Sequence, residues 1–220
     1  MISVLIADDQ PLIRTAVSHL LDAEADLDVV GQAADGLQAV SLTRELRPDI
    51  VVMDIRMPEM DGIEATRSIR ADPELAGSRV LILTTFEEDE YVFSALRSGA
   101  SGFVGKGAEP EEIARAVRAV HDGDSLLSPI ATRALIGHYL SIDPSPRTSS
   151  ESLDLLTPRE VEILTRVARG LSNDEIADAL YISPHTSKTH VNRIMAKLQA
   201  HDRAQLVIIA YETGLVAPTS

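Results

Sequence analysis

The chain has 220 residues, of which 45% are apolar and 25% charged, a balance typical of soluble proteins with a substantial core. It has no cysteine, which excludes disulfide bonds and thiolate chemistry. Its net charge of -14 argues against nucleic-acid binding over the whole surface, and no apolar run is long enough to span a membrane. We therefore expect a cytoplasmic protein without membrane contact.

The first half of the chain alternates strand-like and helix-like segments, the pattern of repeated βα units. The strands are predicted at Ser3–Ala7, Leu27–Ala33, Ile50–Met53, Val80–Thr84 and Gly102–Val104. Apolar residues at helical spacing predict helices near Leu12–Leu21, Leu37–Leu46, Ile63–Arg70, Asp89–Ser98 and Pro110–Val120. Residues 1–122 are thus expected to form an α/β domain with a doubly wound, five-stranded parallel sheet.

Residues 123–152 are predicted to link this domain to a second one. The run PIATRALIGHYL favours one further helix, whereas SIDPSPRTSSES is rich in serine and proline and has almost nothing to bury. Residues 153–220 then contain only helix signals and predict a smaller all-α domain. Capping boxes open helices at Thr157–Glu160 and Ser172–Glu175, Ser183–Pro184 opens a helix to about Gln199, and Asp202 caps a last helix that ends near Gly214.

Three carboxylates follow predicted strands, Asp8 and Asp9 after the first and Asp54 after the third. A single aspartate at a strand end is more often a turn former or a helix cap, so the argument depends on the group. The carboxyl ends of parallel strands meet at one crevice, where an all-oxygen set suits Mg²⁺. A carboxylate can accept a phosphoryl group, a nearby lysine such as Lys106 can neutralise its oxygens, and Thr84 can hydrogen-bond it.

The blocks IADDQPLIR, DIRMPEMDG, LTTF and SGFVGK each follow a predicted strand, and in this order they resemble the receiver domain of bacterial two-component response regulators. The resemblance implies a flavodoxin-like fold and a sensor histidine kinase as partner. It implies that Asp54 is the phosphoacceptor and that Lys106 pairs with the phosphoryl group. The remaining implied roles are Mg²⁺ ligands at Asp8, Asp9, Asp54 and the backbone carbonyl of Arg56, and a switch pair at Thr84 and Phe103.

The blocks LTPREVEIL, ARGLSNDEIADAL and SPHTSKTHVNRIMAKL resemble the LuxR-type helix-turn-helix domain. In that reading the helix from Pro184 is the recognition helix, and it lies in a locally basic stretch of this acidic chain. Lysine and asparagine side chains suit base edges in the major groove of double-stranded DNA. We expect base contacts from Lys188, Thr189 and Asn192, and phosphate contacts from His190, Arg193 and Lys197.

The last helix carries more apolar surface than a small bundle needs, and we expect Leu206, Val207 and Ile209 to form a dimer surface. A single recognition helix on so acidic a protein should bind weakly, whereas a pair can bind an inverted-repeat site. The sequence therefore predicts a homodimer of the phosphorylated protein.

Together these features predict a DNA-binding transcription regulator that phosphorylation of Asp54 switches, with at most self-catalysed phosphoryl transfer and autodephosphorylation as enzymatic activity. Two alternatives stay open. Aspartyl-phosphate hydrolases usually have a second aspartate two residues after the nucleophile, where this chain has Arg56. A helical adaptor for protein or RNA would also fit the basic helix.

Two residues depart from the family patterns. Gly107 follows Lys106 where receivers often have proline, which leaves the geometry at Lys106 open, because a cis bond before glycine would cost about 2.5 to 4 kcal/mol. Ser187 stands where a branched aliphatic residue is common, and it puts the local packing in question.

Overall fold

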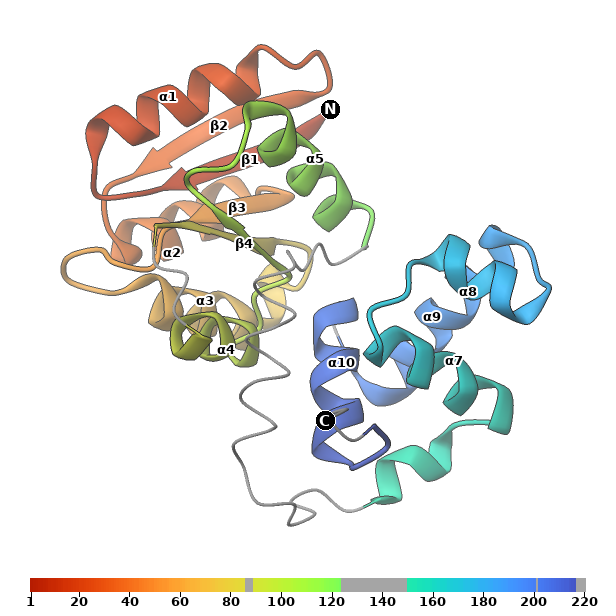
Figure 1. Ribbon diagram of the computed structural model, residues 1–220. Coiled ribbons are helices and arrows are strands. Elements are labelled where there is room, and N and C mark those ends of the chain that lie inside the picture. The colour runs from red at the N-terminus through yellow and green to blue at the C-terminus, as the bar shows by residue number, and fades with distance from the viewer. Residues whose placement is uncertain (86–88, 124–149, 201, 217–220) are drawn as a thin grey trace. The chain divides into compact units, whose positions relative to one another are not determined.

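The computed structural model describes residues 1–85, 89–123, 150–200 and 202–216 (Figure 1). The chain divides into two compact units, Met1–Ala134 and Leu135–Ser220. The helix expected in PIATRALIGHYL lies outside the described residues.

The first unit contains a parallel five-stranded sheet, as predicted. Its strands run in the order β2-β1-β3-β4-β5, and every neighbouring pair is parallel. Their bounds are β1 Ile2–Ala7, β2 Leu27–Ala33, β3 Ile50–Met53, β4 Arg79–Thr84 and β5 Gly102–Gly105. All four side chains of β3 are buried, as expected of a central strand that is covered on both faces.

Helices cover both faces of this sheet. Figure 1 shows α1 and α5 on one face and α2, α3 and α4 on the other. Asp35 and Asp61 cap α2 and α3 by accepting backbone hydrogen bonds, and Pro11 and Pro110 open α1 and α5. The bounds are α1 Pro11–Asp22, α2 Gly36–Leu46, α3 Gly62–Ala71, α4 Asp89–Arg97 and α5 Pro110–His121, with a 3₁₀ helix, η1, at Pro73–Leu75.

The second unit is helical. Its elements are the 3₁₀ helix η2 Ser150–Leu155 and the α-helices α7 Pro158–Ala168, α8 Asn173–Leu180, α9 Pro184–Leu198 and α10 Arg203–Glu212. Both expected capping boxes are formed, at the starts of α7 and α8. The end of the predicted linker differs from expectation, since residues from Ser150 onward belong to η2, which packs against α9. No helix among the described residues is long and apolar enough to cross a membrane.

Candidate metal centre and nucleic-acid interface

The three predicted carboxylates meet at the carboxyl edge of the sheet. Ligand oxygens of Asp8, Asp9 and Asp54 lie within 4.8 Å of one another. Asp8 and Asp54 are each only 3% exposed, whereas Asp9 is open to solvent. Such a set of hard oxygen donors fits a Mg²⁺ ion, which needs few carboxylates because it keeps several waters.

The sheet hydrogen bonding continues one residue beyond the strands and fixes the two buried aspartates. The Asp54 N–H donates to the carbonyl of Ala7 at 2.8 Å, and the Asp8 N–H donates to the carbonyl of Ala33 at 3.1 Å. The side chains also accept local backbone bonds, from Gln10 to Asp8 at 2.9 Å and from Ile55 to Asp54 at 2.8 Å. Both carboxylates are therefore held by rigid backbone.

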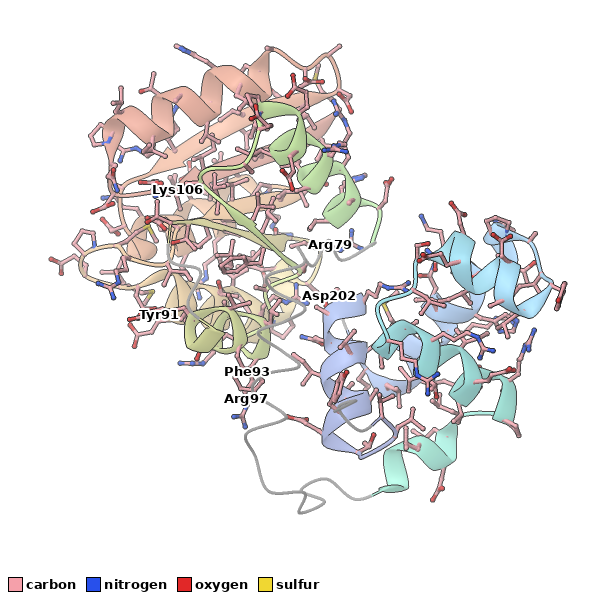
Figure 2. The ribbon with its side chains drawn as sticks, viewed as in Figure 1. Arg79, Tyr91, Phe93, Arg97, Lys106 and Asp202 are labelled. Carbon is pink, nitrogen blue, oxygen red and sulfur yellow. The ribbon has the colours of Figure 1, made fainter. Side chains whose placement is uncertain are left out.

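Lys106 reaches the same cluster from the end of β5 (Figure 2). Its Nζ lies 2.8 Å from Oδ2 of Asp54 and 2.6 Å from Oδ2 of Asp8, and its side chain is almost fully buried. Burial alone would lower the pKa of the Lys106 ammonium, but the hydrogen bonds to Asp54 and Asp8 outweigh this effect and raise the pKa. Lys106 is thus a fixed positive charge that contacts two of the three carboxylates.

The loop after Asp54 packs too closely to admit larger residues. A Cβ atom at Gly62 would lie 1.9 Å from the carbonyl oxygen of Asp54, and one at Gly36 would lie 2.4 Å from the carbonyl oxygen of Met60. The Gly62 N–H donates to the carbonyl of Ile55 at 2.8 Å. The two glycines allow this loop to fold back tightly against the strand that carries Asp54.

The predicted switch residues are both buried in the sheet. Thr84 ends β4 with no exposed area, and Phe103 in β5 is 1% exposed. The Lys106 N–H donates to the carbonyl of Thr84 at 2.9 Å, which ties the two neighbouring strand ends together. All peptide bonds of the described residues are trans, including the one between Lys106 and Gly107.

The side chain of Arg56 contacts the helix α4. Its Nη2 donates to the hydroxyl of Tyr91 on α4 at 2.9 Å, and its guanidinium carbon lies 5.4 Å from the centroid of the Tyr91 ring. A cation in this place cannot act as the acid and base that the hydrolase alternative requires. No sequence pattern indicated the Tyr91 contact, since the two residues are 35 positions apart in the chain.

The predicted DNA-contact residues lie on α9, which a hydrogen bond from the Thr186 N–H to the hydroxyl of Ser183 caps at 3.1 Å. Asn192 and Arg193 are exposed, whereas Lys188, Thr189 and His190 are half-buried. The Thr189 hydroxyl donates to the carbonyl of His185 at 2.9 Å, one turn earlier. Nδ1 of His190 is buried and has no hydrogen-bond partner among the described residues.

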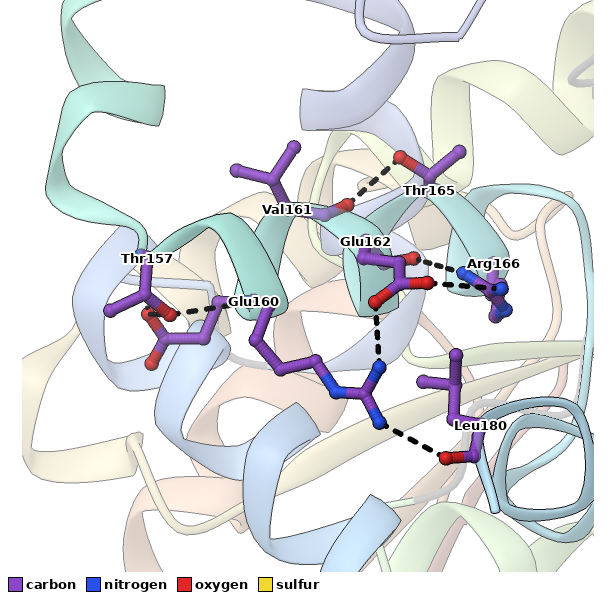
Figure 3. A network of polar contacts seen from close by, with 8 residues as sticks. Thr157, Glu160, Val161, Glu162, Thr165, Arg166 and Leu180 are labelled. Atoms are coloured by element: carbon purple, nitrogen blue, oxygen red, sulfur yellow. Dashed lines mark hydrogen bonds and ion pairs between the residues drawn. The ribbon is translucent and has the colours of Figure 1, made fainter. Parts of the chain in front are cut away.

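Lys197 contacts the start of α7. Its Nζ lies 2.7 Å from Oε2 of Glu160, the buried glutamate of the first capping box. Glu160 also accepts a hydrogen bond from the Thr157 N–H at 2.7 Å (Figure 3). The Lys197 hydrogen bond, together with that of Thr157, lowers the pKa of the Glu160 carboxyl to about 2. Lys197 therefore fixes α9 to α7, a role that its place on a basic helix did not indicate.

The remaining predictions concern packing. Ser187 is fully buried, and its hydroxyl has no hydrogen-bond partner among the described residues. The departure from the family pattern at Ser187 thus leaves a buried hydroxyl in the core of the helical unit. Of the predicted dimer surface, Leu206 and Val207 are buried and Ile209 is half-buried in the single chain. Two of the three therefore offer little free surface here, and their part in a dimer stays a prediction.

Comparison with known proteins identifies both units. Residues 4–118 match the response regulator receiver domain, and residues 154–210 match the bacterial regulatory proteins of the LuxR family. The chain belongs to the LuxR-type response regulators. Such proteins act in two-component systems as DNA-binding regulators of transcription, and this response regulator has both parts that the activity requires.

Relatives match this response regulator over nearly its whole length. It is 38% identical to an uncharacterised transcriptional regulatory protein, YxjL of Bacillus subtilis, over 98% of this chain and 97% of the relative. It is 39% identical to the response regulator protein VraR of Staphylococcus epidermidis over 98% and 99%. Among solved structures it resembles the response regulator ChrA of a heme-sensing two-component system, with 34% identity, a TM-score of 0.52 and 98% of each chain covered.

Proposed function

We propose that phosphorylation of Asp54 by a sensor histidine kinase switches this response regulator, and that the switch controls DNA binding by α9. The observation that carries the assignment of Asp54 is the position of Lys106, whose ammonium contacts Asp54 directly at 2.8 Å. Asp8 contacts the same lysine at 2.6 Å, but Asp54 follows β3, the middle strand of the sheet, and so lies between the strand ends that carry Asp8 and Thr84. Because DNA is the target, we place the protein in the cytoplasm.

Asp8, Asp9 and Asp54 would hold a Mg²⁺ ion, together with the backbone carbonyl of Arg56. The three carboxylates fit this ion because they are hard oxygen donors gathered in one small volume. When bound, the ion would offset negative charge on the oxygens of the phosphoryl group during transfer.

In the proposed reaction, a carboxylate oxygen of Asp54 attacks the phosphorus of a phosphohistidine. A P–O bond to Asp54 forms while the P–N bond breaks, and the released imidazole takes up a proton. The raised pKa of Lys106 keeps its ammonium charged, so that it can pair with the new phosphoryl oxygens. The Thr84 hydroxyl hydrogen-bonds the same group, and Phe103 responds to the movement of Thr84.

We further propose that α9 enters the major groove of double-stranded DNA. Lys188, Thr189 and Asn192 contact base edges, and His190 and Arg193 contact phosphates. Lys197 stays a proposed phosphate contact, and its ammonium also pairs with Glu160, which positions α9. The proposed dimer surface is still Leu206, Val207 and Ile209 of α10, of which Ile209 keeps the most free surface in the single chain, and two joined copies would bind an inverted repeat.

Intact-mass measurement tests the phosphoacceptor. With acetyl phosphate and Mg²⁺, the parent protein is expected to gain one phosphoryl group, and Asp54→Asn is expected to gain none. Asp28→Asn serves as the matched control, because Asp28 is an exposed aspartate of β2 outside the cluster. An Asp54→Asn protein that is labelled as fast as the parent would show that the assignment is wrong.

A further inference from the structure

The turn between α8 and α9 directs one aromatic side chain into solvent. Tyr181, the first residue after α8, is 96% exposed, and α9 begins three residues later at Pro184. Large aromatic side chains usually bury most of their surface, in a core or against a partner. Tyr181 does neither within the described part of the chain.

The backbone at Tyr181 makes the choice of residue more unusual. Its φ of 56° and ψ of 44° lie in the left-handed region, which glycine adopts without strain and bulky side chains rarely adopt. The turn is a helix-ending motif in which the Ile182 N–H donates to the carbonyl of Ala177 at 3.0 Å and the Tyr181 N–H donates to that of Asp178.

The turn needs no help from the phenol group. A guanidinium nitrogen of Arg159 donates to the last helical carbonyl, that of Leu180, at 3.2 Å (Figure 3). The carbonyls of Ala177, Asp178 and Leu180 at the end of α8 are therefore hydrogen-bonded without the Tyr181 side chain. A glycine would form the same turn with less strain, so neither packing nor backbone geometry accounts for a tyrosine here.

A role in DNA binding would account for a tyrosine at this position. In helix-turn-helix proteins the start of the recognition helix enters the major groove while the preceding helix crosses the phosphate backbone, so the turn between them lies beside phosphates. Tyrosine is one of the side chains that donate hydrogen bonds to phosphate oxygens. We propose that Tyr181 is a backbone contact of this regulator, with its hydroxyl donating to a phosphate oxygen at the edge of the groove that α9 enters. The inference rests on the proposed role of α9.

A phosphate contact from tyrosine can be distinguished experimentally from phosphate contacts made by lysine and arginine. Tyrosine is neutral and releases no counterions, so its loss should weaken binding without changing the salt dependence. A phosphate contact is also independent of base sequence, which makes a duplex of random sequence a valid probe.

The experiment compares Tyr181→Gly, Tyr181→Phe and Gln199→Gly in the full chain. Gln199 is the matched control, because it is an exposed residue with a φ of 55° at the opposite end of α9. Both glycine variants should keep or increase the protection of α8 and α9 from hydrogen exchange, since each relieves left-handed strain. Fluorescence anisotropy then measures affinity for the random duplex at several low salt concentrations.

We expect Tyr181→Gly and Tyr181→Phe to bind about tenfold more weakly than the parent, the loss of one hydrogen bond to a charged group, with an unchanged slope of affinity against salt. Gln199→Gly should bind like the parent. Parent-like binding by Tyr181→Gly overturns the contact, and parent-like binding by Tyr181→Phe overturns the role of the hydroxyl. A parent that does not bind the duplex would instead count against α9 as the DNA-binding helix.

Discussion

Ser187 has a fully buried hydroxyl in the helix that carries the predicted DNA-contact residues, and the described residues offer it no hydrogen-bond partner. An unsatisfied buried polar group costs about 1 to 3 kcal/mol. We expect Ser187→Val to raise the free energy of unfolding by about that amount, because it removes the hydroxyl and adds apolar volume. Calorimetry of the full chain measures the change.

The control for this change is Ser187→Ala, which removes the hydroxyl without adding volume. It should stabilise the protein less than valine does. If both variants are less stable than the parent, the hydroxyl stabilises the fold through a hydrogen bond, and the cost assigned to its burial is wrong.

Lys188 and Asn192 are expected to discriminate between DNA sequences. A good base contact is worth about 1 to 3 kcal/mol of discrimination, so Lys188→Ala and Asn192→Ala should lower specific affinity by more than non-specific affinity. Arg193→Ala is the control, and it should weaken binding to all sequences alike and reduce the salt slope by about 1. Equal losses on specific and random duplexes would remove Asn192 from base readout.

At the scale of elements, the ion pair between Lys197 and Glu160 links the end of α9 to the start of α7. The pKa of Glu160 in the folded protein is about 2, below its ordinary value of 4.5. A carboxyl group with a lowered pKa stabilises the fold above the ordinary pKa, and this contribution is lost as the pH falls towards the folded value. The helical unit should thus lose stability between pH 4.5 and about 2.

Calorimetry of the parent and of Glu160→Gln over this pH range tests the link. The stability difference between them should be complete above pH 4.5 and shrink as the pH is lowered. Glu175→Gln is the matched control, because Glu175 occupies the same place in the capping box of α8 but is exposed. A pH dependence that is the same in both variants would contradict the special role of Glu160.

Local patterns were enough to predict most elements of this fold. The composition of runs such as Ile50–Met53 indicates strands, and capping residues indicate where helices start. Observed and predicted bounds therefore differ by about a residue at each end. Contacts between residues that are far apart in the chain could not be predicted from the sequence. Lys197 shows its charge in the sequence but not its partner 37 positions earlier, and Tyr181 shows no sign of its left-handed backbone.

The whole molecule combines an acidic receiver unit with a helical unit that is basic only around α9. We expect phosphorylation to favour a dimer, because pairing two recognition helices makes the second DNA contact nearly intramolecular. To shift a dimer-competent state from about 1% to about 99%, the phosphoryl group would have to favour that state by roughly 5.5 kcal/mol. A partial shift is therefore the expected result.

Sedimentation of the beryllofluoride-treated protein tests this expectation, since the fluoride complex stands in for phosphoryl-aspartate. The treated parent should shift towards a dimer, both free and on inverted-repeat DNA, and Asp54→Asn should not respond. A treated protein that binds this DNA tightly while it remains a monomer would refute the mechanism.

The three carboxylates of the cluster differ in their exposure to solvent. Asp8 and Asp54 are buried, so the open side of the cluster is the side of Asp9. In the proposed reaction the phosphodonor is an anion, and it would approach Asp54 past the negative charge of Asp9. We therefore expect the order of binding to matter. A cation that binds at Asp9 first would replace electrostatic repulsion of the anionic donor by attraction.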